Sequence, residues 1–319
     1  MPATPDVASM ASEPVYTLAD LKSWSRSTST LAVLGSPIAH SVSPAMHNAA
    51  IATEVRHNPE LTGLSYVRFE IKPEDLKQAL PLLHAKGFKG INLTVPHKVI
   101  AFSLIEKIDP SALAIGAVNT LRWAPEGWEG FNTDGYGLAT AVKDSLDIEL
   151  TDSNILLIGA GGAARGAAVE CLQRKCRSLT LVNRSAENLE ALSLHLKPIA
   201  GDSVLQSVTP ASLLEPDASG INRGVLVINA TSAGLKTTDL APINLARLRE
   251  PAGVFDMIYN PPKTKLMQQA EELGIISANG LTMLVHQGAK AFEIWTSCPA
   301  SRTAAVMLKA AREALSLNA

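Results

Sequence analysis

A lysine stands where the start of a predicted helix disfavours it. The stretch GINLTVPHKV, residues 90–99, alternates apolar and polar residues in the period-two pattern of a half-buried strand, then runs into Pro-His-Lys. Proline suits the first turn of a helix, and apolar residues at helical spacing continue to Ile108. The positive end of a helix dipole disfavours a cation by up to about 1 kcal/mol. Lys98 at this place suggests a functional role, with a solvated surface lysine as the alternative.

A pair of serines precedes another predicted helix. In GSPIAHSVSPAMHNAAI, residues 35–51, Ser41 and Ser43 lie two positions apart, and Pro44 begins a helical run. Ser43 before a proline is also a good N-cap, which is a purely structural alternative. Ser41 has no such alternative. Two hydroxyls on one side of an extended segment can bind a carboxylate or a diol.

Further polar side chains stand at the ends of predicted elements. Asn92 and Thr94 belong to the strand described first, and Asn119 ends the short apolar run IGAVNTL, residues 115–121. Asp134, in GFNTDGYG, falls at a predicted helix start, where capping the helix is the structural alternative.

A glycine loop carries the clearest chemical signal. In NILLIGAGGAARGAAVECLQ, residues 154–173, an apolar strand runs into G-x-G-x-x-A and then into a helical pattern. A dinucleotide site needs this arrangement, because the backbone must approach a pyrophosphate and the helix N-terminus must face the anion. The predicted cofactor contacts of this loop are Gly159, Ala160, Gly161, Gly162 and Ala163.

The end of the next predicted strand, LTLVN, selects the cofactor. An NAD site usually presents an acidic residue there to the ribose hydroxyl, whereas this chain has Asn183, Arg184 and Ser185. Arg184 can bond to a 2′-phosphate, and its two neighbours add neutral donors. The sequence therefore predicts NADP, with Arg184 as a solvated loop residue being the alternative.

Two later apolar strands, in GVLVINATSAG (224–234) and GVFDMIYN (253–260), end in polar loops. Ligands of open parallel sheets lie beyond the carboxyl ends of the strands. Asn229, Thr231, Ser232, Met257 and Tyr259 are therefore expected near the nicotinamide end of the cleft, with turn residues as the alternative for each.

Strand-like and helix-like segments alternate from Leu31 onward, which predicts an α/β fold, and 319 residues suffice for two domains. A formal charge of −2, no basic run and 4% aromatic residues argue against a nucleic acid or an anionic membrane surface as partner. No stretch of about 18 apolar residues occurs. Three cysteines without disulfide or metal spacing suggest a reducing compartment, and scattered histidines predict no metal site.

Residues 1–28 are small and polar, with one possible short helix in TLADLKSW. They lack the apolar centre of a secretory signal, and their acidic residues argue against a transit peptide. We therefore expect a flexible N-terminal extension and a cytoplasmic protein.

Taken together, these stretches resemble the shikimate dehydrogenase family. The resemblance runs in order from about Leu31 to beyond Trp295. It rests on the motifs SPIAHSVSP, NLTVPHK, GAVNT, NTDGYG, GAGGAARG, VNRS, NATSAG, DMIY and NGLTMLVHQGAKAF.

The resemblance implies a reaction and roles for named residues. The reaction is the reversible NADPH-dependent reduction of 3-dehydroshikimate to shikimate. Lys98 and Asp134 match the lysine and the aspartate at the reacting centre. The implied substrate-binding residues are Ser41, Ser43, Asn92, Thr94, Asn119, Tyr259 and Gln287, and Gly280 joins Thr231 and Met257 at the cofactor. Without the resemblance, Gln287 would be read as an exposed helix glutamine.

The implied architecture has two domains. An N-terminal α/β substrate domain comprises residues 29–133 and 280–319, and a Rossmann-type, doubly wound NADP domain comprises residues 134–279. The returning helix from Gly280 places apolar residues at helical spacing. The partners expected are the small substrate and, at most, a second copy in a homodimer.

One departure from the family pattern concerns the cofactor. Members that use NADP often carry a second arginine four residues after the first, where this chain has Asn188, and Ser185 replaces the more usual threonine. Two rival functions stay open. One is a quinate/shikimate dehydrogenase working with NAD, and the other is a non-catalytic regulator that binds NADP or shikimate.

Overall fold

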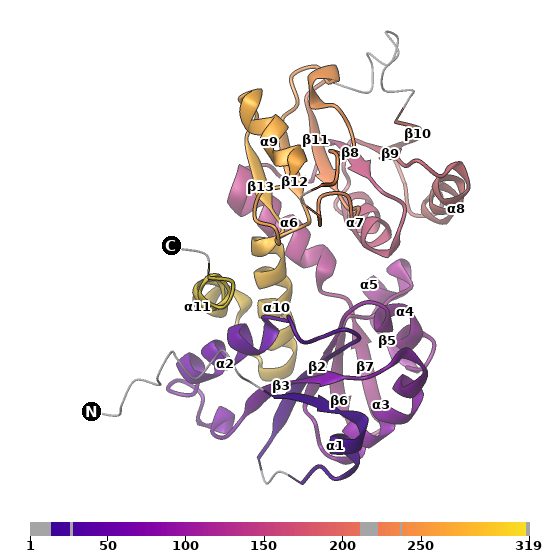
Figure 1. The fold of residues 1–319 in the computed structure, drawn as a ribbon. Coiled ribbons are helices and arrows are strands. Elements are labelled where there is room, and N and C mark those ends of the chain that lie inside the picture. The colour runs from indigo at the N-terminus through magenta and orange to yellow at the C-terminus, as the bar shows by residue number, and fades with distance from the viewer. Residues whose placement is uncertain (1–13, 26–27, 211–222, 237, 317–319) are drawn as a thin grey trace. The chain divides into compact units, whose positions relative to one another are not determined.

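The computed structural model describes residues 14–25, 28–210, 223–236 and 238–316. The chain forms two compact units: unit 1, residues 1–133 with 287–319, and unit 2, residues 134–286 (Figure 1). The chain re-enters unit 1 at Gln287, within a helix, whereas the sequence suggested residue 280. Over the described ranges, no helix has both the length and the apolar character needed to cross a membrane.

Unit 1 is built on a seven-stranded sheet in the order β1-β3-β2-β4-β6-β7-β5. β6 runs antiparallel to β4 and β7, and the other pairings are parallel. The strands are β1 (Val15–Thr17), β2 (Thr30–Gly35), β3 (Ser65–Glu70), β4 (Gly90–Leu93), β5 (Lys107–Ile108), β6 (Thr120–Ala124) and β7 (Gly127–Phe131). The helices are α1 (Leu18–Lys22), α2 (Ser43–Glu54), α3 (Leu76–Ala85), α4 (His97–Phe102), α5 (Pro110–Ile115) and α11 (Ala300–Ala314), with 3₁₀ turns at Pro59–Leu61 and Pro73–Asp75.

The strand before Lys98 differs from the half-buried one that was predicted. All four residues of β4 are buried, because β4 lies between β2 and β6. Ile91 and Leu93 enter the apolar core of unit 1, and Asn92 is buried as well. The strand ends at Leu93, and Val95 is 74% exposed. The alternating pattern therefore marks two different buried faces, one apolar and one polar.

The helix after β4 is shorter than its apolar pattern predicted. α4 ends at Phe102, where the Ser103 hydroxyl donates to the Ile100 carbonyl. Ile105 lies beyond the helix, and Ile108 lies in β5, which pairs with β7. Pairing with β7 includes an ion pair of Lys107 with Glu129. Tertiary pairing thus overrides the helical spacing of residues 105–108.

Part of the segment expected to be flexible is folded. Tyr16 lies in β1, which pairs with β3, and the predicted short helix forms as α1. Trp24 packs within 5.5 Å, between ring centroids, of Tyr16, Phe69 and Phe88. The Lys86 ammonium donates to the Trp24 carbonyl at 2.9 Å. A few aromatic side chains hold this polar segment against the rest of unit 1. Their partners are distant in the chain, so the local sequence pattern does not reveal these contacts. Residues 1–13 and 26–27 lie outside the description.

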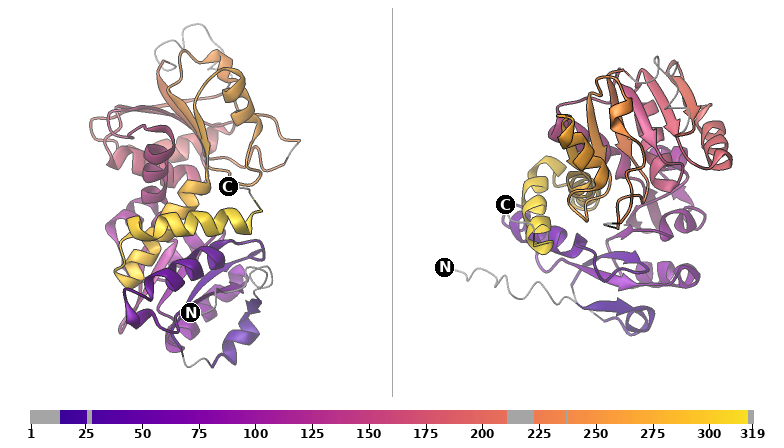
Figure 2. Two further views of the ribbon diagram at one scale, coloured as in Figure 1. Left: turned by 90° about the vertical axis from the view of Figure 1, so that its left-hand side faces the viewer. Right: turned by 45° about the horizontal axis from the view of Figure 1, so that its top comes forward.

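The C-terminal helix packs on α2 (Figure 2). The guanidinium of Arg302 lies 2.7 Å from the carboxylate of Glu54, whose side chain is only 3% exposed. A buried carboxylate loses its hydration, and the ion pair with Arg302 offsets part of that cost.

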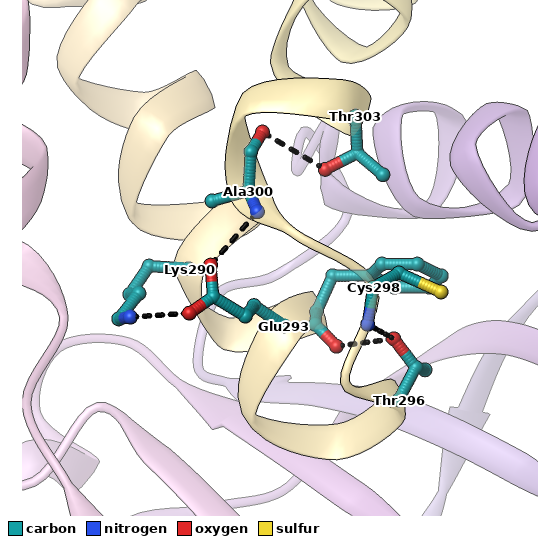
Figure 3. Close-up of polar contacts among 7 residues, drawn as sticks. Lys290, Glu293, Thr296, Cys298, Ala300 and Thr303 are labelled. Carbon is teal, nitrogen blue, oxygen red and sulfur yellow. Dashed lines mark hydrogen bonds and ion pairs between the residues drawn. The ribbon is translucent and has the colours of Figure 1, made fainter.

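A short turn joins α10 (Leu281–Thr296) to α11, and one carboxylate organises it (Figure 3). Glu293 accepts from the Lys290 ammonium at 2.6 Å and from the Ala300 N–H at 2.8 Å. Burial raises the pKa of Glu293, but these two donors outweigh it and hold the pKa below its ordinary value. The Thr296 hydroxyl accepts from the Cys298 N–H. The predicted returning helix is confirmed, with Leu281, Val285 and Phe292 buried.

Unit 2 has a six-stranded, wholly parallel sheet in the order β10-β9-β8-β11-β12-β13. This is the 3-2-1-4-5-6 order of a doubly wound dinucleotide fold, as predicted. The strands are β8 (Asn154–Ile158), β9 (Ser178–Val182), β10 (Val204–Val208), β11 (Val225–Asn229), β12 (Gly253–Asp256) and β13 (Ser277–Asn279). The helices are α6 (Asp134–Leu146), α7 (Gly162–Gln173), α8 (Ala186–Leu196), α9 (Lys265–Glu272) and the first turns of α10, with a 3₁₀ turn at Leu245–Arg247.

Candidate active site

A cavity of about 760 Å³ opens at the carboxyl end of the unit 2 sheet. Its walls are the loops that follow β8, β9 and β11, and strand order reverses between β8 and β11. Ligands of open α/β sheets bind at this reversal. The predicted cofactor residues that line the cavity are Gly159, Ala160, Gly161, Asn183, Arg184 and Thr231.

The glycine loop fits a pyrophosphate. Gly159 has a φ of +121°, a conformation that favours glycine, and a Cβ there would meet the Ala230 carbonyl at 3.0 Å. Apart from the adjoining residues and the backbone of α7 itself, no described atom lies within 4 Å of where a Cβ on Gly161 or Gly162 would be. Gly161 caps α7, so the open space faces the first N–H groups of a twelve-residue helix. Gly162 and Ala163 are exposed at this helix start but do not line the cavity.

The loop after β9 presents one cation to the cavity. Arg184 is exposed and belongs to the lining. The Asn183 amide donates to the Ser185 carbonyl at 3.0 Å, which shapes the loop. The Ser185 hydroxyl accepts from the Asn188 N–H and caps α8, and Ser185 does not line the cavity. Asn188 is exposed in the first turn of α8.

Sequence reasoning missed one wall of this cavity, residues 238–242. The Asp239 carboxylate accepts from the N–H groups of Gly234 and Lys236, both at 3.0 Å, and these bonds lower its pKa. Leu240 is 84% exposed beside the cavity. The segment carries no motif. The only hint in the sequence is a large apolar residue, Leu240, shortly after the NATSAG loop.

The loops after β11 and β12 are tied together inside unit 2. The Asn229 side-chain amide donates to the buried Asp256 carboxylate at 3.0 Å. The side-chain oxygen of Asn229 accepts from the Thr231 N–H and hydroxyl. Burial raises the pKa of Asp256. A Cβ on Gly280 would overlap the Met257 carbonyl. Asn229 and Gly280 therefore have structural reasons for their identity.

Tyr259 and Met257 are half-buried beyond β12, and neither lines the cavity. Burial raises the pKa of the Tyr259 hydroxyl, so this group is a neutral donor near neutral pH. A role for either residue toward a ligand remains a prediction.

Five of the predicted or neighbouring polar residues of unit 1 form one hydrogen-bonded network, of which four are buried and Gln287 is half-buried. The Asn92 amide donates to the Asn119 carbonyl at 3.3 Å and to the Thr120 hydroxyl at 3.1 Å. The Asn119 side-chain oxygen accepts from the Thr120 hydroxyl and from the Thr133 N–H, both at 2.9 Å. The Thr133 hydroxyl reaches the Gln287 side-chain oxygen at 3.5 Å. β4, β6, the end of the β7 segment and α10 thus meet at these side chains.

Asn92 is more occupied than the sequence suggested. Both amide hydrogens go to the network just described, and its oxygen accepts from the Tyr66 hydroxyl at 2.8 Å. Tyr66 stacks on His47 with ring centroids 4.2 Å apart. Burial lowers the pKa of His47 to about 3, with Asn92 opposing the change, so His47 is neutral. Asn92 therefore holds its neighbours in place, and a direct contact with a ligand remains a prediction.

The local contacts of the two serines differ from those expected. α2 begins at Ser43 with Val42 at the N-cap, and no side chain caps the helix, so the N-cap alternative for Ser43 is wrong. The Ser41 hydroxyl instead accepts from the Ser43 N–H at 3.3 Å, a structural contact that the sequence did not suggest. A bond with Ser43 opposes the burial that raises the pKa of Tyr66. Both serines are half-buried.

Lys98 lies in the first turn of α4, as predicted. The preceding His97 is fully buried, its Nε2 bonds to the Ile71 carbonyl at 2.8 Å, and burial lowers its pKa. The Lys98 carbonyl accepts from the Val118 N–H at 3.0 Å. The Thr94 carbonyl accepts from the His97 N–H, and its own N–H bonds to β2. Several contacts therefore fix the backbone that carries Lys98.

Asp134 is the first residue of unit 2 and of α6. It stands inside the first turn of that helix and directly follows Thr133 of the unit 1 network. Lys98 belongs to unit 1. The meeting of the lysine and the aspartate remains a prediction.

Comparison with known proteins identifies relatives over nearly the whole chain. The model of the shikimate dehydrogenase substrate binding domain matches residues 33–121, and that of the shikimate 5′-dehydrogenase C-terminal domain matches residues 280–312. Shikimate dehydrogenase (NADP(+)) of Bacillus licheniformis is 40% identical over 83% of this chain and 90% of its own length.

Solved structures agree. Shikimate 5-dehydrogenase of Thermus thermophilus, in complex with NADP(H) and shikimate, has a TM-score of 0.76 at 32% identity, covering 90% of this chain and 100% of that one. A 5-ketofructose reductase of a Gluconobacter species also has a TM-score of 0.76, at 28% identity over 90% of this chain and 99% of its own.

Proposed function

Since this chain belongs to the shikimate dehydrogenase family, we propose that it catalyses the reversible NADP-dependent reduction of 3-dehydroshikimate to shikimate. The observation that carries the proposal is the buried amide and hydroxyl network around Asn119 in unit 1. A rigid set of neutral hydrogen-bonding groups suits a ring with several hydroxyls.

Unit 2 has the features that NADP requires. Gly159, Ala160 and Gly161 would hold the pyrophosphate at the start of α7, and Arg184 would contact the 2′-phosphate. Thr231, Met257 and Gly280 would lie toward the nicotinamide. When bound, the cofactor supplies or accepts the hydride.

The residues of this chain manage the proton and the charge. In the reductive direction, a hydride adds to the carbonyl carbon and a proton must reach the oxygen. We expect the Lys98 ammonium to stabilise the developing alkoxide and to donate or relay that proton, with Asp134 as its partner. Ser41 and Ser43 receive the substrate carboxylate, and Thr94, Asn119, Gln287 and Tyr259 contact the ring. Asn92 holds Asn119 in place.

A single assay tests the proposal. Absorbance at 340 nm is followed with shikimate or quinate and with NADP or NAD, using the purified full chain. We expect reduction of NADP with shikimate to exceed the other three combinations. Faster turnover of quinate with NAD would favour the quinate/shikimate alternative. No reduction in any combination would favour a non-catalytic binder, and 5-ketofructose with NADPH serves as a further arm.

The proposal extends to the compartment and the oligomeric state of the enzyme. We place it in the cytoplasm, where its three buried, free cysteines would stay reduced. We expect a monomer or a homodimer with no nucleic-acid partner.

A further inference from the structure

The two faces of strand β3 contact different parts of unit 1. Val67 and Phe69 point into the apolar core of unit 1. Tyr66, Arg68 and Glu70 alternate with them, so they occupy the opposite face. Each of these three polar side chains contacts a segment that carries predicted substrate residues.

Glu70 holds the beginning of the loop between β2 and α2. Its carboxylate accepts from the Ser36 hydroxyl at 2.8 Å and from the Ile38 N–H at 2.9 Å. Both oxygens therefore have partners, 32 and 34 residues away in the chain. The next residue of the chain continues the attachment, because the Ile71 N–H donates to the Gly35 carbonyl.

Arg68 holds the end of the same loop. Its Nη1 donates to the Ala39 carbonyl at 2.6 Å and to the Ser41 carbonyl at 3.3 Å. Arg68 is half-buried, so its charge is less screened than that of a fully exposed arginine. These two acceptors are neutral, and they fix a guanidinium nitrogen next to the backbone of Ser41.

The geometry points to Arg68 as a specificity-determining residue for the carboxylate of the substrate, an inference that rests on the proposed function. Arg68 fixes the backbone of Ser41, and its charge attracts the anionic group that the Ser41 and Ser43 hydroxyls receive. Neutral hydroxyls bind carboxylates and alcohols alike, so they do not by themselves select an acid. A fixed cation close to them distinguishes an acid from a neutral ring of the same shape.

The test compares an acid with its neutral ester. Initial rates of NADP reduction are measured with shikimate and with shikimate methyl ester, for the full-length wild type, Arg68→Met and Arg68→Lys. We expect Arg68→Met to raise KM for shikimate about tenfold and to change kcat by less than about threefold. KM for the ester should change by less than about twofold, and Arg68→Lys should recover most of the loss for the acid.

The control removes the same charge elsewhere. Arg312 is exposed on α11, and Arg312→Met should leave both KM values unchanged. A rise of KM for acid and ester by the same factor in Arg68→Met would show a purely structural role and overturn the inference.

Salt dependence gives a second measurement that needs no variant. In the wild type, raising ionic strength from about 0.05 M to about 0.3 M should raise KM for shikimate but not for the ester. Equal salt dependence for both compounds would overturn the inference even if Arg68→Met fails to fold. A wild type that oxidises neither compound would instead refute the proposed function, so the two failures are distinguishable.

Discussion

The two units arrange the groups that we propose to bind ligands in different ways. In unit 1, side chains from β4, β6, α10 and the segment after β7 hold one another through hydrogen bonds between buried amides and hydroxyls. In unit 2, the cavity is lined largely by the backbone of loops at the ends of three strands, with open space over Gly161. A side-chain network can select one substrate but fails when one member is lost. A site built on glycine backbone tolerates substitution of the side chains around it. Its selectivity between NADP and NAD depends on a few residues at the rim of the cavity.

The largest effect is expected at the reacting centre. Lys98→Ala should lower kcat about a thousandfold, because the charge that stabilises the alkoxide is lost, with KM changed by less than about threefold. Steady-state kinetics with shikimate and NADP measure both constants. Lys77→Ala, at an exposed lysine of α3, is the control and should behave as wild type. Near-normal turnover of Lys98→Ala would remove Lys98 from the mechanism.

The proposed pairing of Lys98 with Asp134 is tested by the pH dependence of the rate. Asp134→Asn keeps the shape of the side chain and removes its charge. If the two groups interact, the pH–rate profile of this variant should shift from that of the wild type. Superimposable profiles would contradict the pairing.

The unit 1 network predicts a loss of stability. Asn119→Ala should lower the free energy of unfolding by about 3 kcal/mol, since the buried Thr120 hydroxyl and Thr133 N–H lose their acceptor. Urea unfolding measures the change. Asn244 in unit 2 is exposed, and its side chain accepts from the Ala246 N–H, so Asn244→Ala should lose about 1 kcal/mol. Equal losses in the two variants would contradict the distinction between the units.

At the rim of the unit 2 cavity, one cation should decide between the cofactors. Arg184→Met should raise KM for NADP about tenfold and leave KM for NAD unchanged. Arg247→Met, at another exposed arginine of unit 2, serves as the control. Asn188→Arg should lower KM for NADP, because it adds the second arginine next to the first. If neither Arg184→Met nor Asn188→Arg changes the preference, the 2′-phosphate lies elsewhere.

The smallest effect expected is a pH dependence of stability in unit 1. The pKa of His47 is about 3 in the folded chain, below the ordinary value of about 6.5, so the unfolded chain binds the proton more readily. Stability is therefore fully present above about pH 6.5 and decreases as the pH falls. Between pH 7 and 5.5, the loss from His47 should be about 1 kcal/mol. His47→Phe should lose less stability over this range than the wild type, and identical losses would contradict the assignment.

Motifs with local physical requirements were predictable from the sequence. The glycine loop, the strand before it and the helix after it follow from the fingerprint, and α4 places Lys98 where its proline indicated. The wholly parallel order of the unit 2 sheet follows from alternating strands and helices. In both motifs, the residues that form the pattern and the helix or strand that they predict lie within about twenty residues of each other along the chain.

Features that depend on distant contacts were not predictable. The burial of Asn92 requires the neighbouring strands, and the Arg68 contacts join positions 27 and 29 residues apart. Whether Ser43 caps α2 depends on where that helix begins, to within one residue. Residues 238–242 line the cavity together with the loops after β8 and β9, which lie far earlier in the chain.

Strand β1 has a practical consequence for anyone shortening this chain. It covers the outer edge of β3, the strand that carries Arg68 and Glu70. A version starting at residue 29 would discard β1 and Trp24, leaving backbone N–H and C=O groups of β3 available to strands of other molecules. Uncovered edges of this kind promote aggregation. Poor solubility of such a version would then reflect a missing sheet edge, so an N-terminal deletion is best ended before Val15.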